Sequence, residues 1–294
     1  MTIEPLKTEP LKIESVTIEP ATIEPLTIDV RGLRHAFGAL PVIERLDLEV
    51  ADGGFVSLIG PSGCGKSTLL RVLAGLLVPT AGQVEVDGRS CIGRSGLVAY
   101  MPQRDTLLPW RRALGNATLG AEIAGGGRMH GSATDGRPRR GATSRRRSLD
   151  AARLRARELF ERFGLAGFED SWPSQLSGGM RQRVALLRTL LAGRDVLALD
   201  EPFGALDALT RRELQAWLAT VLSSEQRTTL LVTHDVDEAL WLSDTVVVLS
   251  PRPARVRATI GVPFPRPRSP LLVADPEFGR LKAEVLARLE DAPT

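Results

Sequence analysis

The stretch that decides the fold is Gly60-Pro61-Ser62-Gly63-Cys64-Gly65-Lys66-Ser67, which separates two apolar patterns. The run before it, FVSLI (55–59), is short and continuously apolar, as a buried β-strand is. The run after it, KSTLLRVLAGLL (66–77), has the apolar spacing of an α-helix. Glycines let such a loop turn successive backbone N–H groups toward phosphate oxygens, and the helix start adds the positive end of its dipole. The stretch therefore predicts a nucleotide-phosphate site.

Two side chains of this loop carry the expected chemistry. Lys66 is placed to reach the outer phosphates, and the hydroxyl of Ser67 is placed to ligate Mg²⁺. A plain glycine-rich turn, the alternative interpretation, would not account for these two residues. The residues expected to bind ATP here are Gly60, Pro61, Ser62, Gly63, Cys64, Gly65, Lys66, Ser67 and Thr68.

Strand and helix patterns alternate on both sides of the loop. TIDVRGL (27–33) and LDLEV (46–50) alternate apolar and polar residues, as half-buried strands do. Helical patterns such as RRELQAWLATVL (211–222) separate further strands. This order predicts an α/β fold with a parallel sheet and right-handed crossovers. The continuous apolar runs that suit its central strands are DVLALD (195–200), TLLVT (229–233) and TVVVLS (245–250).

A second polar pair, Asp200-Glu201, ends one of these runs. An aspartate at a strand tip near the phosphates is placed to hold the metal, directly or through water. The adjacent Glu201 is placed to take a proton from attacking water. An Asp-Glu pair after a strand is ordinarily a solvated turn, and the phosphate loop upstream favours catalysis here.

Composition sets limits on the class of protein. The chain has 294 residues, 43% hydrophobic and 25% charged, which excludes a collagen-like or wholly disordered protein. Its net charge of +3 is local, because residues 125–150 hold seven arginines against two aspartates, so no nucleic acid is expected as a partner.

No apolar run approaches the roughly 20 residues that span a bilayer, and no signal-peptide pattern opens the chain. Two cysteines make no disulfide framework. We expect a cytosolic protein that serves a membrane only through another subunit.

Three segments depart from the strand–helix pattern. Residues 1–26 repeat every five, from TIEPL onward, and their prolines block a helix, so we expect a disordered tail. Residues 125–150 are rich in Gly, Ser and Arg and predict a flexible insertion; a surface for RNA or anionic lipid is the less favoured interpretation. In residues 263–294 a Pro-rich linker leads to a helix capped by Asp275, whose apolar face we expect to dock on its own domain.

Between the two polar sites stands Leu176-Ser177-Gly178-Gly179-Met180. With it the chain resembles the ATP-binding subunits of ABC transporters, whose signature is LSGGQ; Met180 replaces the glutamine. The resemblance covers about residues 27–262. It implies a P-loop NTPase (RecA-like) core with a parallel sheet, an antiparallel β subdomain and an inserted helical subdomain at about 113–182. It also implies a head-to-tail dimer, in which one copy closes on the ATP of the other through Ser177, Gly178, Gly179 and Met180.

The other family elements match in order. Phe37 stands where an aromatic residue stacks on adenine, and Gln103 matches the glutamine that contacts Mg²⁺ or water and senses the membrane subunit. Asp207 belongs to the D-loop, and His234 matches the switch histidine that contacts the γ-phosphate. The resemblance therefore implies catalytic roles for Glu201, His234 and Gln103, and Mg²⁺ held by Ser67, Gln103 and Asp200.

Leu108-Pro109-Trp110 and the intact DEPFGALD (200–207) resemble the nitrate, sulfonate and taurine importer group, some members of which carry thiamine-precursor pyrimidines. Trp110 would lie where a helix of the membrane subunit docks; the alternative is a core aromatic residue. The implied function is the ATPase subunit of a small-molecule importer, peripheral at the cytoplasmic face of the membrane. Its implied partners are integral membrane permease subunits and a separate substrate-binding protein.

Two other functions compete with this one. A soluble ABC ATPase acting on DNA or the ribosome usually has two cassettes in one chain or long coiled coils, and this sequence shows one cassette and no heptads. A P-loop kinase would not need the signature at Ser177.

Overall fold

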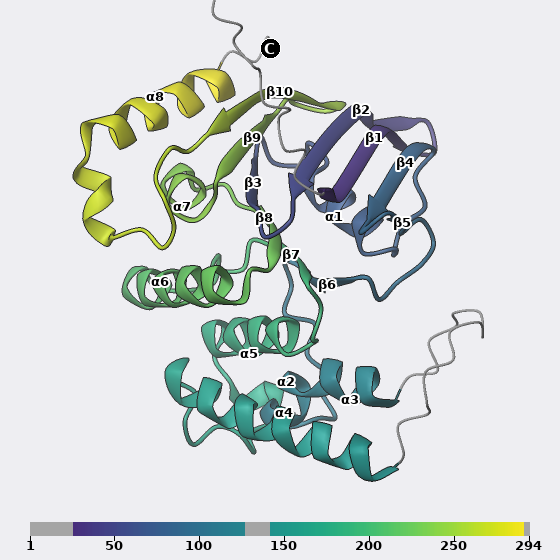
Figure 1. Ribbon diagram of the computed structural model, residues 1–294, viewed down its shortest axis with the longest axis vertical. Helices are drawn as coiled ribbons and strands as arrows, with labels where there is room; N and C mark the ends of the chain where they lie inside the picture. Colours follow the sequence, from purple (N-terminus) through teal and green to yellow (C-terminus); the bar gives the residue numbers. More distant parts are fainter. Residues whose placement is uncertain (1–25, 127–141, 291–294) are drawn as a thin grey trace, which may run out of the picture.

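The computed structural model describes residues 26–126 and 142–290, and ten strands within those ranges form one mixed sheet (Figure 1). Their order across the sheet is β5-β4-β1-β2-β10-β9-β3-β8-β7-β6. The strands are β1 (Leu26–Phe37), β2 (Leu40–Ala51), β3 (Phe55–Ile59), β4 (Ala81–Val86), β5 (Arg89–Ser90), β6 (Val98–Met101), β7 (Val196–Asp200), β8 (Thr228–Val232), β9 (Thr245–Leu249) and β10 (Ala254–Gly261). The helices are α1 (Lys66–Leu73), α2 (Ala113–Ala117), α3 (Leu119–Gly126), α4 (Ala142–Arg162), α5 (Gly178–Leu190), α6 (Ala208–Glu225), α7 (Val236–Leu242) and α8 (Pro276–Glu290), with 3-10 turns η1 (Pro173–Gln175) and η2 (Pro270–Ala274).

Strands β6, β7, β8, β3 and β9 run parallel and form the core of the sheet. Every residue of β3, β7 and β8 is buried, as continuous apolar runs require when both faces of a sheet are covered. The predicted α/β fold with a parallel sheet is confirmed. Val232 at the end of β8 pairs with Leu58 of β3 and with Asp200 of β7, so the loops that follow these three strands share one edge.

Strands β2, β1, β4 and β5 pair antiparallel and form the second part of the sheet, beside α1 in Figure 1. Alternation along β2 buries Leu46, Leu48 and Val50 and exposes the residues between them. Strand β10 joins the two parts, because it pairs parallel with β2 and antiparallel with β9. This arrangement is the predicted antiparallel β subdomain.

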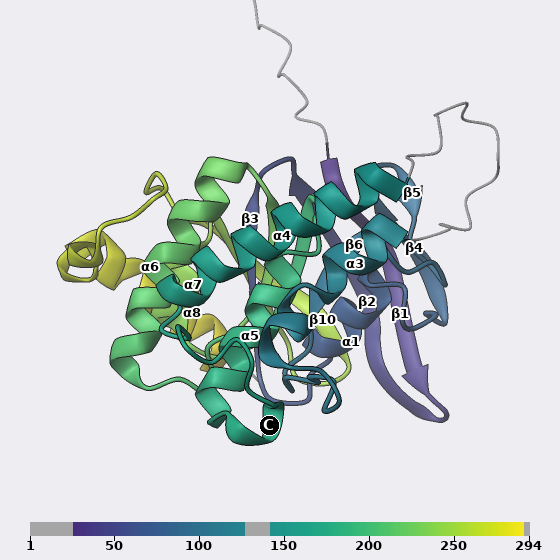
Figure 2. The same ribbon diagram turned by 90° about the horizontal axis from the view of Figure 1, so that it is seen from below.

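Helices α2, α3, α4 and α5 form a helical layer at the end of the molecule remote from α8 (Figures 1 and 2). The structure differs from the expected insertion at residues 125–150, because residues 142–150 are the beginning of α4. The sequence hides this start, since its apolar spacing begins only at Leu149. Residues 1–25 and 127–141 lie outside the described ranges, so the predictions made for them stay predictions. None of the described helices combines the length and the apolar content needed to cross a bilayer.

Helix α8 closes the C-terminal side of the core. It packs against α7, β9 and β10, and its residues Phe278, Leu281 and Val285 are buried. The carboxylate of Asp275 accepts a hydrogen bond from the backbone N–H of Glu277 at 2.8 Å, which caps the helix as its sequence predicted. The last helix therefore docks on its own domain.

Candidate nucleotide-binding and hydrolysis site

Lys66 is the first residue of α1 and follows the loop of residues 60–65, which joins β3 to this helix. Its Nζ donates hydrogen bonds to the carbonyl oxygens of Gly60 (2.7 Å) and Pro61 (2.8 Å). Only 7% of the residue is exposed. The backbone of the loop therefore curls around the ammonium group, and a cation so placed complements phosphate oxygens.

The conformation of this loop requires glycine at two positions. Gly63 and Gly65 have φ angles of 73° and 122°, which residues with a Cβ atom rarely adopt. A Cβ atom at Gly65 would lie 3.2 Å from side-chain atoms of Val42 and Ile43 in β2. Gly65 is also the N-cap of α1 and offers no side chain to the first N–H groups of the helix, which suits them to an anion.

Asp200 ends β7 and is 2% exposed. Burial raises the pKa of its carboxyl group above the ordinary value, and the neighbouring Ser67 hydroxyl acts in the opposite direction, as do the charges of Arg71 and Lys66. A carboxylate and an alcohol oxygen thus lie side by side next to the phosphate loop. These are ligand types that Mg²⁺ takes when phosphates and waters complete its shell, so the two residues fit the expected metal.

Glu201 is the point at which the three predicted catalytic residues meet. Nε2 of Gln103 donates a hydrogen bond to Oε2 of Glu201 at 3.1 Å, and Nδ1 of His234 lies 3.5 Å from the same oxygen. The three side chains come from the segments that follow β6, β7 and β8. The carboxylate is largely covered, with 24% of the side chain exposed, whereas the imidazole is 70% exposed.

The backbone of Glu201 is strained. Its φ angle is 49°, a left-handed value that residues other than glycine seldom adopt and that costs about 1–3 kcal/mol. The N–H of Glu201 donates to the carbonyl of Val232 at 2.9 Å, and its own carbonyl accepts from Nε2 of Gln182 at 3.2 Å. Neighbouring elements thus hold the strained residue, which is typical of functional positions.

The signature residues lie at the start of α5. Ser177 is its N-cap, and its Oγ accepts a hydrogen bond from the N–H of Met180 at 3.2 Å. Gly179 lies against the D-loop, because a Cβ atom built on it would be 3.4 Å from the carbonyl oxygen of Ala205. In the same D-loop Asp207 caps α6 by accepting from the N–H of Thr210, a bond that lowers the pKa of its carboxyl group. No hydrogen bond within the described residues joins the signature to the phosphate loop of the same chain.

Phe37 ends β1 with 48% of its surface exposed. Its ring and the imidazole of the buried His35 form a T-shaped pair with a centroid distance of 4.6 Å. A half-exposed aromatic ring is suited to stacking on a planar base. The expected role of Phe37 therefore remains consistent with its surroundings.

Trp110 lies on the surface, with 71% of the residue exposed. This excludes the core-aromatic alternative. The loop that carries it is held by Asn116, which is fully buried. The amide of Asn116 accepts from the N–H of Leu108 (2.7 Å) and donates to the carbonyls of Leu108, Arg111 and Arg112. The sequence analysis missed Asn116, for which the only signal was a polar residue within the small and apolar stretch ALGNATLG.

Two arginines of α5, also missed, hold the segment between Gln103 and Trp110. Nε of Arg181 pairs with Asp105 at 2.8 Å, and Arg188 donates to the backbone carbonyls of Asp105 and Thr106 at 2.8 and 2.9 Å. The signature helix is thereby tied to the loop that presents the exposed tryptophan.

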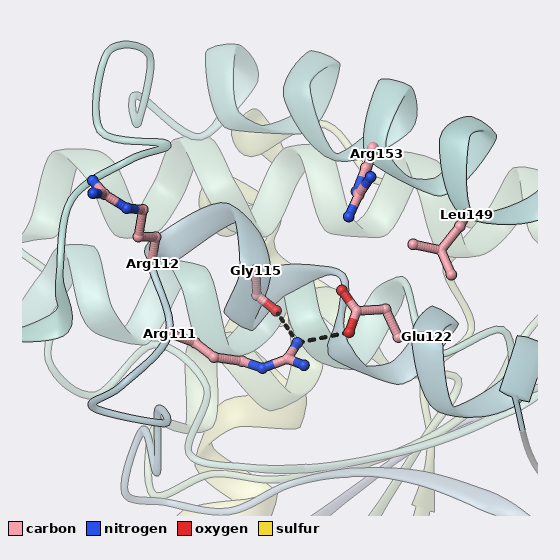
Figure 3. Close-up of a pocket in the computed structure, with 6 residues that line it drawn as sticks. All are labelled: Arg111, Arg112, Gly115, Glu122, Leu149 and Arg153. Atoms are coloured by element: carbon pink, nitrogen blue, oxygen red, sulfur yellow. Dashed lines mark hydrogen bonds and ion pairs between the residues drawn. The ribbon is translucent and has the colours of Figure 1, made fainter. Parts of the chain in front are cut away.

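A pocket of about 410 Å³ opens beside this loop (Figure 3). Arg111 is neutralised there, because its Nη1 donates to Glu122 at 2.7 Å and to the carbonyl of Gly115 at 3.1 Å. Arg112 donates to the carbonyl of Asp170 and stacks over Trp172, 4.9 Å from the ring centroid. The surface around Trp110 thus combines exposed aromatic rings with positive charge. The residues that line the pocket are Arg111, Arg112, Gly115, Glu122, Leu149 and Arg153.

Comparison with known proteins gives concordant findings. The ABC transporter family model matches residues 43–204. The chain is 44% identical, over 90% of its length and 94% of the relative, to the aliphatic sulfonates import ATP-binding protein SsuB 1 of Rhodococcus jostii. It is 42% identical to the protein of the same name from Agrobacterium fabrum, over 88% of this chain and 82% of the relative. The structure resembles that of a dimeric bacterial ABC transporter cassette with a TM-score of 0.66 at 25% identity, covering 81% of this chain and 99% of the other.

Proposed function

Since the chain belongs to the family of ABC transporter ATP-binding subunits, we propose that it energises the import of an aliphatic sulfonate. It is the ATP-hydrolysing subunit of an ABC importer for a small molecule. Among the substrates expected from the sequence, the sulfonate has specific support, because relatives at 44% and 42% identity are named for sulfonate import. The soluble alternative acting on DNA or the ribosome is not favoured by these relatives.

The observation that carries the mechanism is the convergence of Gln103 and His234 on Oε2 of Glu201, next to the loop that holds Lys66. Glu201 accepts a proton from the water that attacks the γ-phosphorus, and ADP leaves with the bridging oxygen. His234 and Gln103 orient the carboxylate, the water and the γ-phosphate. Lys66 balances the charge of the outer phosphates.

Ser67 and Asp200 hold Mg²⁺ in this proposal, with Gln103 reaching it directly or through water. The Ser67 hydroxyl lies near enough to the buried carboxylate of Asp200 to lower its pKa, which supports this assignment. The ion, when bound, neutralises charge on the phosphate oxygens. Residues of the chain then need only position water and accept its proton.

A second copy of the chain completes the site. The signature lies at a helix start, a place suited to an anion, but makes no hydrogen bond to its own phosphate loop within the described residues. The solved cassettes that the chain resembles are dimeric, one of them with ADP and phosphate bound. In the proposed dimer Ser177, Gly178, Gly179 and Met180 face the γ-phosphate of the partner's ATP.

The permease docks at Trp110 in this proposal, which places the subunit at the cytoplasmic face of the membrane. An exposed tryptophan on a loop held by a fully buried amide is a preorganised apolar anchor, and such anchors dominate interface energies. The positively charged pocket in Figure 3 adjoins this anchor. A separate substrate-binding protein delivers the sulfonate to the permease.

The test compares Glu201→Gln with Glu213→Gln, an exposed carboxylate of α6, as the control. Glu201→Gln should bind ATP normally and lose about 10²–10⁴-fold in turnover, because the general base is gone and the shape is kept. Normal turnover of Glu201→Gln would mean that another residue is the general base. Uptake of labelled ethanesulfonate and of nitrate into vesicles that contain the assembled transporter tests the substrate. ATP-dependent uptake of nitrate without uptake of ethanesulfonate would refute the sulfonate assignment and would leave the proposed ATPase mechanism unaffected.

A further inference from the structure

Helix α7 links the proposed switch histidine to the C-terminal segment. His234 precedes Asp235, whose carboxylate caps the helix by accepting from the N–H groups of Asp237 (2.9 Å) and Glu238 (3.1 Å). The N–H of Asp235 donates in turn to the Thr233 hydroxyl at 3.0 Å. The backbone on both sides of His234 is fixed by these bonds, so the position of the imidazole follows that of α7.

Arg268 closes the other end of this helix. Its Nη1 donates to the carbonyl oxygens of Leu240 (2.9 Å), Trp241 (3.1 Å) and Ser243 (2.8 Å). Its Nε and Nη2 donate to the carbonyl of Phe264 at 2.9 and 2.6 Å. The last carbonyls of a helix have no partner within the helix. A residue of the Pro-rich linker therefore supplies the C-terminal cap of α7.

Arg268 acts here as a buried cation whose partners are carbonyl dipoles. It is 7% exposed, and no ion pair within the described residues includes it. Burial lowers the pKa of its guanidinium to about 10, so the group stays charged at neutral pH. A positive charge is favourable at the negative end of a helix dipole. A buried guanidinium is tolerated only when its N–H donors have acceptors, and these carbonyl oxygens supply them.

Two further residues fix the C-terminal segment to the core and to α7. Nε of Arg266 pairs with Asp244 at 2.7 Å, and its Nη2 donates to the carbonyl of Gly53 at 3.0 Å. Nζ of Lys282 in α8 pairs with Asp237 in the first turn of α7 at 2.8 Å. Figure 1 shows α8 lying beside α7. Helix α7 is thus held at both ends by residues that follow the cassette.

We propose that Arg268 is a positioning residue for His234, and that residues 263–290 brace α7 so that the histidine keeps its place beside Glu201. The proposal rests on the role proposed above for His234. The bracing segment acts on turnover and leaves ATP binding alone, because Lys66 and its loop belong to a different element.

The test uses Arg268→Met, which keeps the bulk of the side chain and removes its donors, with Arg280→Met as the control. Arg280 lies in α8, its side chain is 60% exposed, and its ion-pair partners among the described residues are Glu277 and Glu284 of its own helix. Arg268→Met should keep the dissociation constant for ATP within about 2-fold and lose about 10- to 100-fold in turnover, as small displacements of catalytic groups do. Deuterium exchange in residues 234–243 should rise. Arg280→Met should change neither quantity.

His234→Ala and the double variant His234→Ala/Arg268→Met distinguish an error in the role proposed for Arg268 from an error in the role proposed for His234. Because Arg268 acts through the histidine, Arg268→Met should have no further effect in the His234→Ala background. Normal turnover of His234→Ala would overturn the role of the histidine itself. Impaired His234→Ala together with unimpaired Arg268→Met would overturn the brace alone, as would loss of ATP binding in Arg268→Met. If the methionine variant does not fold, Arg268→Lys takes its place, and unchanged exchange and turnover in that variant overturn the proposal.

Discussion

Replacement of Trp110 by alanine is expected to weaken assembly with the permease and to leave the fold intact. The residue is 71% exposed, so most of the ring is available to a partner. A tryptophan buries at most about 250 Å², so the exposed part amounts to roughly 180 Å², worth up to about 4 kcal/mol at about 25 cal/mol/Å². Truncation of an interface anchor typically costs about 2 kcal/mol or more. We therefore expect the dissociation constant for the permease to rise about 30-fold.

The measurement pairs two readouts on the same protein. Binding of the subunit to permease in lipid nanodiscs gives the dissociation constant, and thermal unfolding of the free subunit gives its stability. Leu271→Ala is the matched control, because Leu271 is an exposed apolar residue (83%) in the C-terminal segment and outside the Trp110 loop. The control should change neither readout.

Two results would refute the reasoning. An affinity within about 3-fold of the wild type, in a well-folded variant, would leave Trp110 without a docking role. A loss of about 3–5 kcal/mol in the free energy of unfolding, the cost of deleting a core aromatic ring, would mean that the ring is buried in solution. Neither result would bear on ATP hydrolysis, for which Glu201 is the proposed general base.

Lys66→Ala should abolish ATP binding in calorimetry, because it removes the cation around which the phosphate loop curls; unchanged affinity would refute the assignment of the site. Asn116→Ala should lower both the melting temperature and the affinity for the permease, since it removes the bonds of a fully buried amide to the Leu108 N–H and to three carbonyls and so releases the Trp110 loop. Burial raises the pKa of Glu238 to about 8, above the value of about 4.3 of an unfolded chain. Its contribution to stability is complete below about pH 4.3 and is lost as the pH rises through about 8. The melting temperature of the wild type should therefore fall from pH 5 to pH 8, and a Glu238→Gln variant with the same fall would contradict this.

The strands and the phosphate site were predictable because their signals are local. A continuous apolar run specifies a buried strand, and the spacing from Gly60 to Ser67 carries its own geometry. The family resemblance pointed to Gln103, Glu201 and His234 in order along the chain, and the structure brings the three side chains together. The parallel registers of β6 with β7 and of β7 with β8 bring the ends of these strands, and with them the three side chains, to one edge of the sheet.

Arg268 and Asn116 were missed because the atoms that they bind belong to the backbone. Arg268 bonds to carbonyls of Leu240, Trp241 and Ser243, and any residue type supplies a carbonyl, so no pattern of side chains marks the contact. Asn116 likewise binds only backbone atoms. The start of α4 escaped prediction because a helix whose first turns lack apolar residues has no periodicity to detect.

Helix α5 joins the loop that presents Trp110 to the site of hydrolysis. Arg181 and Arg188 hold that loop through charge-assisted bonds to a carboxylate and to two carbonyls, whereas a single neutral bond of 3.2 Å joins Gln182 to the carbonyl of Glu201. Charge-assisted bonds are roughly twice as strong as neutral ones. We expect a displacement of the loop to reach α5 through the two arginines. Because Ser177 is the N-cap of the same helix, the displacement would reach the signature, and the bond of Gln182 would pass it to the strained backbone of Glu201.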